Sequence, residues 1–221
     1  MISKLKDPGS AITHFLGILM AIIATIPLIS KTLNQSFWHT LSCAIFITSM
    51  ILLYTASTLY HSLDVSVKMN TLLKKIDHIM IFILIAGTYT PLCTIALHGQ
   101  TGTILLGLVW GIALIGILIK AFWVYCPKWF SSSIYIALGW ICIFAFPQIY
   151  HALTTPALIW LIAGGVIYTI GGILYAIKFS IFNSKHTHFG SHEIFHLFVM
   201  GGSLCHYILI YFYVVNIPLS K

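Results

Sequence analysis

Residues 102–123 read GTILLGLVWGIALIGILIKAFW, a stretch in which Lys120 is the single charged side chain. A helix that crosses the hydrocarbon core of a bilayer needs about 20 mostly apolar residues, and it satisfies its backbone hydrogen bonds internally. The stretch therefore predicts a transmembrane α-helix.

Six further apolar stretches of similar length lie on either side of it, and together they indicate an all-α membrane protein. Hydrophobic residues make up 59% of the chain and charged residues 7%, a composition that excludes a soluble globular protein. The seven predicted spans are residues 11–29, 37–60, 76–97, 102–123, 131–150, 156–177 and 192–215. Because the connections are short, we expect one seven-helix bundle domain over residues 1–221.

The lysines predict the orientation of the bundle. The formal net charge is +7 and arginine does not occur, so the charge comes from lysines in the connections and gives no reason to expect a nucleic-acid partner. Nine lysines fall on the side of the N-terminus, namely Lys4, Lys6, Lys68, Lys74, Lys75, Lys120, Lys128, Lys178 and Lys185, and only Lys31 and Lys221 fall opposite. By the positive-inside rule we expect a multi-pass protein of the inner (plasma) membrane, with the N-terminus cytoplasmic and the C-terminus external.

Ionisable residues gather on that cytoplasmic side. It is expected to hold all four acids, Asp7, Asp64, Asp77 and Glu193. His61 closes the second span, and His192 and His196 open the last one at i, i+4 spacing, which places both rings on one helix face. A single histidine in an apolar helix is usually a packed core residue, but three converging at one depth indicate a zinc site.

A carboxylate and a hydroxyl are expected beside these histidines. A catalytic zinc typically has three protein ligands and a water, and Asp77, at the expected start of the third span, is positioned to orient and deprotonate that water. Ser57, one turn from His61, is positioned to bind an oxyanion or to orient a ligand. Residues 192–196 also spell the H-E-x-x-H pattern of zinc proteases, in which Glu193 would be the base. We favour Asp77 because it is expected at the depth of the histidines on a neighbouring helix.

The remaining histidines are expected outside the zinc site. His78 would at most support Asp77. The others are expected to be interfacial or structural: His39, His98, His151, His186, His188 and His206. Four glycines in the sixth span, Gly164, Gly165, Gly171 and Gly172, are expected to permit close helix packing.

Several motifs resemble those of the bacterial hemolysin III family, which belongs with the progestin and adipoQ receptors and the adiponectin receptors. They are THFLG (13–17), STLYHS (57–62), DHIMIFILIAGTYTP (77–91), LIAGGVIYTIGGILY (161–175) and HEIFHLFV (192–199). The resemblance implies a seven-helix bundle with a cytoplasmic N-terminus, zinc held by His61, His192 and His196, Asp77 on the zinc-bound water and Ser57 beside it. Asp7 and Ser10 stand where the family usually has an acid and Asn, and we assign that segment no direct role.

The wider superfamily resembles alkaline ceramidases and is regarded as a set of metal-dependent hydrolases of lipid amides or esters. We therefore expect a zinc-dependent hydrolase with a membrane lipid or fatty-acyl substrate. Two alternatives stay open: a zinc-stabilised receptor or sensor of lipid or membrane-energy homeostasis, and a hemolysin-type channel or pore. A pore would need a polar lining through the bilayer or broken helices, and the sequence predicts neither. The sequence does not predict an oligomeric state.

Overall fold

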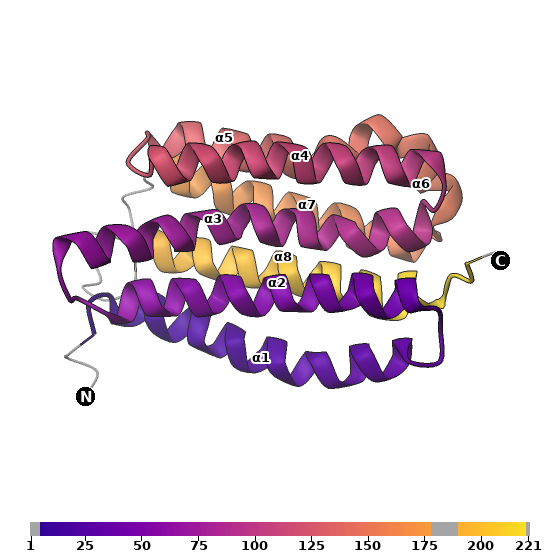
Figure 1. The fold of residues 1–221 in the computed structure, drawn as a ribbon, viewed down its shortest axis with the longest axis horizontal. Coiled ribbons are helices and arrows are strands. Elements are labelled where there is room, and N and C mark those ends of the chain that lie inside the picture. Colours follow the sequence, from indigo (N-terminus) through magenta and orange to yellow (C-terminus); the bar gives the residue numbers. More distant parts are fainter. Residues whose placement is uncertain (1–4, 178–189, 220–221) are drawn as a thin grey trace.

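A computed structural model of the 221-residue chain describes residues 5–177 and 190–219. In these ranges seven helical segments are long and apolar enough to cross a membrane, and no strand occurs among them, which confirms the predicted all-α, seven-helix architecture (Figure 1). We call the end of the bundle where the first helix begins the proximal end and the opposite end the distal end. Lys4, Lys178, Lys185, Lys221, His186 and His188 lie outside the described residues.

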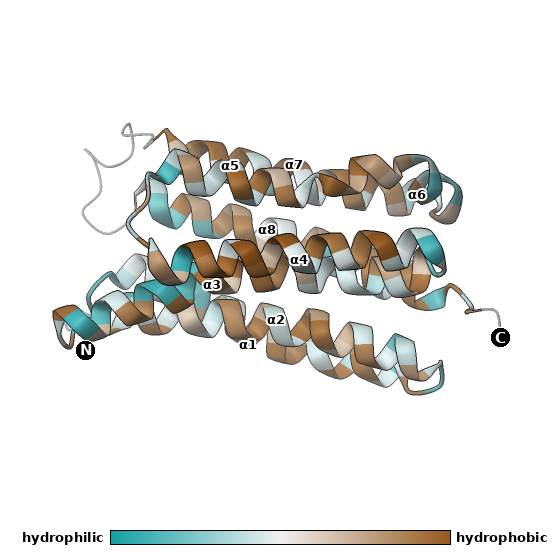
Figure 2. Ribbon diagram, turned by 45° about the horizontal axis from the view of Figure 1, so that its top comes forward, coloured by the Kyte–Doolittle hydropathy of each residue, from teal (hydrophilic) through white to brown (hydrophobic). Residues whose placement is uncertain are grey.

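The chain passes back and forth between these two ends. Its elements are α1 (Pro8–Thr32), α2 (Phe37–Ser62), α3 (Val67–Pro91), the π-helical η2 (Leu92–Ala96), α4 (Gln100–Phe122), α5 (Lys128–Gly139), the 3₁₀ η3 (Ile141–Ala145), α6 (Phe146–Ala152), α7 (Thr155–Ala176), α8 (Ser191–Phe212) and the 3₁₀ η4 (Val214–Asn216). Apolar residues dominate the middle of the helices and polar residues gather near their ends, as expected for a bundle embedded in a bilayer (Figure 2).

Two helices form the centre of the bundle. In the most apolar 18-residue stretch of each span, 56% is buried for Phe37–Ser62 and 61% for Val67–Ala96. The first, fourth, fifth and sixth spans bury 28% or less, so most of their apolar surface faces outward. Side chains such as Ile23 and Ile26 are largely exposed in this way, which suits a surface solvated by lipid rather than water.

The third span begins earlier than predicted. Its helix starts at Val67, where the Ser66 hydroxyl accepts a hydrogen bond from the Met69 amide at 3.2 Å and caps the helix. The apolar pattern missed these turns because they carry lysines, which are good helix formers but not apolar. Asp77 therefore lies about three turns inside α3, and the expectation that it opens the helix is wrong.

The fifth span is broken where the sequence predicts a continuous helix. Helix α5 ends at Gly139, and Pro147, which lacks an amide hydrogen, stands in the first turn of α6. The Tyr89 hydroxyl bridges the break: it donates to the Gly139 carbonyl at 2.6 Å and accepts from the Cys142 amide at 3.0 Å. Backbone groups freed within a membrane need such partners. The expectation that no span is broken is wrong.

Glycines bring α7 and α8 into close contact, as predicted. A Cβ atom at Gly171 would lie 2.6 Å from Cβ of Phe198, and one at Gly164 would lie 2.5 Å from Nε2 of His206. Both distances are shorter than a carbon can approach without displacing the facing side chain. Small residues at such positions let helix backbones approach in a membrane.

Candidate metal centre and adjoining cavity

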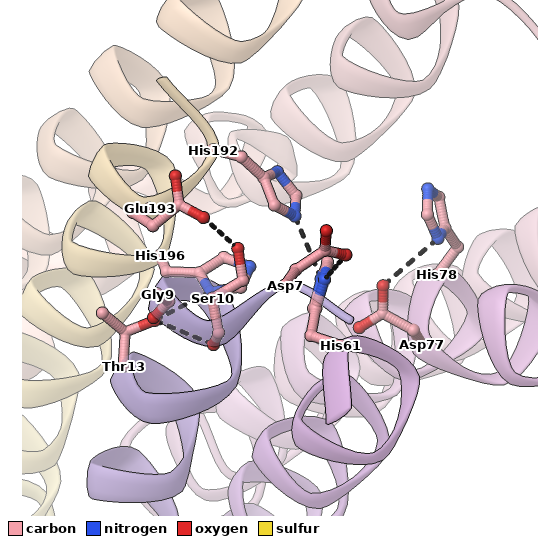
Figure 3. A network of polar contacts seen from close by, with 10 residues as sticks. All are labelled: Asp7, Gly9, Ser10, Thr13, His61, Asp77, His78, His192, Glu193 and His196. Carbon is pink, nitrogen blue, oxygen red and sulfur yellow. Dashed lines mark hydrogen bonds and ion pairs between the residues drawn. The ribbon is translucent and has the colours of Figure 1, made fainter. Parts of the chain in front are cut away.

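Three histidines meet at the proximal end of the bundle. His61 lies in the last turn of α2, and His192 and His196 lie in the first turns of α8. Each offers a ring nitrogen, and these nitrogens all lie within 4.8 Å of one another; Nε2 of His61 and Nε2 of His192 are 3.1 Å apart (Figure 3). The structure thus brings together the three residues that the sequence predicts as metal ligands.

The start of α8 sets the position of its two histidines. The Glu193 carboxylate accepts a hydrogen bond from the Gly190 amide at 2.7 Å, which satisfies a backbone donor at the helix N-terminus. The i, i+4 spacing then places the rings of His192 and His196 with their centroids 4.5 Å apart. Glu193 also accepts a hydrogen bond from the Ser10 hydroxyl, which attaches α8 to α1.

The segment that begins α1 fixes the protonation of two of the histidines. Nδ1 of His61 lies 2.9 Å from a carboxylate oxygen of Asp7, and this hydrogen bond lowers the pKa of Asp7 below its ordinary value. Because a carboxylate can only accept, the proton is on Nδ1 and the lone pair of His61 is on Nε2. Carboxylate–histidine pairs of this kind support metal-bound histidines.

His196 is held in the same tautomer. Its Nδ1 lies 3.1 Å from the Thr13 hydroxyl, which itself donates to the carbonyls of Gly9 and Ser10 at 3.0 and 2.9 Å. The single hydrogen of the hydroxyl is shared between these two carbonyls, so its oxygen accepts from Nδ1–H of His196, and the lone pair of that ring is on Nε2. The segment around Asp7 and Ser10, to which we assigned no direct role from the sequence, therefore contacts the histidine cluster directly.

A fourth histidine joins the cluster, and the sequence did not predict it. The ring of His14 stacks on that of His196, with centroids 3.6 Å apart and an interplanar angle of 8°. His14 is 3% exposed, and neither of its ring nitrogens has a hydrogen-bond partner among the described residues. In the sequence His14 stands out only as part of the THFLG motif, and this motif does not predict that its ring contacts α8.

Asp77 and Ser57 are buried beside the cluster. Both line the cavity that His14, His192 and His196 also line. A carboxylate oxygen of Asp77 lies 3.4 Å from Nδ1 of His78, which also lies 2.9 Å from the Lys74 carbonyl. The Ser57 hydroxyl has no hydrogen-bond partner among the described residues, so a buried polar group faces this space unsatisfied.

The cavity runs from the histidines towards the distal end. It comprises two adjoining spaces that share lining residues such as Tyr89 and His206. The first, about 130 Å³, lies between α3, α5, α7 and α8, and the second, about 270 Å³, reaches Leu92, Leu209 and Ile210. Both parts are lined mainly by apolar side chains, and both are lined by Tyr89 and by the broken end of α5. From Asp77 along α3 to Leu92 at the start of η2, the path is about 22 Å at a rise of about 1.5 Å per residue.

His206 and His39 lie apart from the cluster, as expected. His206 lines both parts of the cavity, with Nε2 3.3 Å from the Leu161 carbonyl. His39 lies at the distal end, where it contacts the Ser36 hydroxyl at 2.9 Å and the Ile217 carbonyl at 3.0 Å.

These features define a seven-span membrane protein with a histidine cluster at one end of an apolar cavity. The pattern of the family described as "Haemolysin-III related" matches residues 2–207, and the chain belongs to that family. The chain is 39% identical over 214 residues to the hemolysin-3 homolog of Bacillus subtilis (strain 168), and the match covers 96% of both chains. It is also 39% identical over 214 residues to hemolysin-3 of Bacillus cereus, and this match covers 95% of this chain and 92% of the relative. The chain is also 25% identical over 219 residues to the adiponectin receptor protein of Drosophila melanogaster, covering 91% of this chain and 49% of the receptor.

Proposed function

We propose that the histidine cluster binds zinc and that the protein hydrolyses an acyl amide or ester bond of a membrane lipid. The observation that carries the proposal is the placement of three histidine nitrogens within 4.8 Å of one another beside an elongated apolar cavity. Metal and acyl chain would then meet at one end of that cavity.

The residues present suit zinc. Neutral imidazoles are common zinc ligands, and the hydrogen bonds from Nδ1 of His61 and His196 leave their Nε2 lone pairs available. The Ser57 hydroxyl and both ring nitrogens of His14, which lack partners within residues 5–177 and 190–219, are polar atoms that a hydrated ion and its substrate can satisfy. A zinc ion held there would lower the pKa of a bound water and polarise a carbonyl group.

The chain's own side chains would perform the remaining steps. Asp77 would accept the proton of the attacking water, and Ser57 would donate a hydrogen bond to the oxyanion that develops on the carbonyl. Both oxygens of Glu193 are engaged, by Gly190 and Ser10, so Glu193 would hold α8 in place rather than act as the base. The apolar cavity would hold the acyl chain and exclude water.

A second candidate function uses the same geometry without turnover. The cluster joins α2 to α8, and Asp7 and Thr13 join both helices to α1. Zinc would then stabilise a receptor or sensor that responds to a lipid in the cavity.

Lipid profiling separates the two functions. Membrane lipids would be compared between cells that produce the protein and cells that lack it, with metal analysis of the purified protein. A hydrolase predicts loss of one acyl lipid and gain of the matching fatty acid when the protein is produced. Identical lipid profiles with zinc present would reject the hydrolase and favour the sensor.

The proposed site of action is the cytoplasmic (inner) membrane, with the proximal end on the cytoplasmic side. The described lysines support this orientation, because Lys31 lies at the distal end and the others lie at the proximal end: Lys6, Lys68, Lys74, Lys75, Lys120 and Lys128. A reporter fused to the C-terminus is expected to be active only outside the cytoplasm. Activity confined to the cytoplasm would reverse the orientation.

A further inference from the structure

A second pocket opens at the proximal end beside the candidate metal centre. It has a volume of about 380 Å³ and lies where α4 ends and α5 begins, against α3 and the end of α7. Its lining includes three lysines, Lys74, Lys120 and Lys128, together with His78, and contains no carboxylate. We call it the basic pocket.

Lys120 is the most unusual residue of the basic pocket. The side chain is 2% exposed, and its ammonium group donates to Oγ of Ser131 at 2.5 Å and to Sγ of Cys126 at 3.0 Å. An ammonium has three hydrogens, so the serine and the cysteine leave one for a further acceptor. Neither of these partners carries the negative charge that a buried cation normally needs.

No side-chain carboxylate among the described residues lines the basic pocket. All four acidic side chains are described, and each has a partner other than Lys120: Asp7 pairs with His61, Asp64 with Asn70, Asp77 with His78 at the wall of the pocket, and Glu193 with Ser10 and Gly190. The burial of Lys120 therefore indicates that an anion from outside the chain completes the pocket.

The other two lysines are held where they can bind the same anion. Nζ of Lys74 lies 4.4 Å from the centroid of the Tyr125 ring, and Nζ of Lys128 lies 4.2 Å from that of Tyr175. Lys128 is also the first residue of α5, so the amide groups of the first turn add their positive partial charge to the same region. Several convergent cationic donors suit a phosphate group.

The basic pocket adjoins the apolar cavity. His78, Ser131 and Tyr175 line both spaces. The Tyr175 ring, which Lys128 approaches, lies with its centroid 5.5 Å from that of His192. A ligand with an acyl chain in the cavity can therefore place a polar head in the basic pocket, with its carbonyl region near the histidine cluster.

We infer that the basic pocket binds the phosphate group of a membrane lipid, so that the substrate class is an acyl lipid with a phosphate-bearing headgroup. The identification of this lipid as the substrate rests on the proposed hydrolase function. The phosphate site itself rests on the lysines and needs neither zinc nor turnover.

Native mass spectrometry in a neutral detergent tests the inference, because it identifies by mass every lipid bound to the protein, whether intact or hydrolysed. The probes are dioleoyl phosphatidic acid, dioleoylglycerol, which has the same chains without phosphate, and inorganic phosphate. The wild type is expected to bind phosphatidic acid about tenfold or more tightly than dioleoylglycerol, as the loss of charge-assisted hydrogen bonds predicts. Inorganic phosphate is expected to bind weakly because it lacks the acyl chains.

Variants locate the binding to the basic pocket. Lys120→Met keeps the length and packing of the side chain, and we expect it to remove most of the preference for phosphatidic acid while binding of dioleoylglycerol is unchanged. Lys74→Gln combined with Lys128→Gln, both near the rim of the pocket, is expected to act in the same way even if Lys120→Met fails to fold. Lys75→Gln is the matched control, since it removes one charge from the same helix but does not line the pocket.

Equal binding of the two lipids by the wild type would overturn the inference, as would an equal loss in the Lys75→Gln control. If inorganic phosphate bound in a lysine-dependent way and phosphatidic acid were not preferred, the ligand of the basic pocket would be a free anion and not a lipid headgroup. Absence of zinc would reject the hydrolase but leave the binding result standing, so the two failures are distinguishable.

Discussion

Replacing His61, His192 or His196 by alanine is expected to abolish metal binding by a protein that otherwise holds about one zinc ion per chain. The three ring nitrogens lie within 4.8 Å of one another, so each is expected to supply one ligand, and the other two cannot hold the ion without it. Elemental analysis of the purified variants measures the outcome, and size-exclusion profiles show whether each variant is folded.

Two variants sharpen this test. Asp7→Ala removes the acceptor of His61 Nδ1–H but no proposed ligand, so zinc affinity is expected to fall by about 10–100-fold without being lost. His39→Ala is the control, because His39 is buried and hydrogen-bonded at the distal end and should leave zinc unchanged. Full zinc occupancy in all three histidine variants would reject the metal centre.

Asp77→Asn is expected to retain zinc and to lose turnover by about 10²–10⁴-fold, the usual contribution of a general base. Asparagine has almost the same shape as aspartate, but it cannot accept a proton at neutral pH. Asp77 is not among the three clustered nitrogen donors, so metal content should not change. Hydrolysis of the lipid identified by profiling, measured alongside zinc content, gives both results on one preparation.

Glu193→Gln is the matched comparison for Asp77→Asn. Its side chain keeps an acceptor for the Gly190 amide, so we expect a modest loss of stability and nearly full turnover. Zinc retained with turnover lost in Glu193→Gln, and turnover kept in Asp77→Asn, would make this a site of the H-E-x-x-H type. The assignment of Asp77 would then be withdrawn.

The seven spans could be predicted because a bilayer imposes length and apolarity on every helix that crosses it. The i, i+4 spacing likewise predicted that His192 and His196 share one helix face. Two local features escaped prediction: the polar first turns of α3, which look unlike a span, and the break after Gly139, which depends on a hydroxyl from another helix.

The supporting part of the cluster could not be predicted, because its contacts join residues far apart in the chain. Asp7 contacts His61 across 54 positions, and Thr13 contacts His196 across 183. No local pattern of apolar and polar residues encodes such pairs. The stacking of His14 on His196 and the burial of Lys120 without a carboxylate partner likewise became visible only in the folded bundle.

Because the histidines are divided between α2 and α8, the site can form only after both helices have been synthesised. His61 is synthesised 131 positions before His192, so the early helices enter the membrane with an incomplete set of donors. The ribosome must deliver α8 before the second and third nitrogens, those of His192 and His196, become available. Metal loading would therefore be a late step of biogenesis, and a chain released before α8 would carry Asp7, Thr13 and His61 but could not assemble the three-histidine cluster.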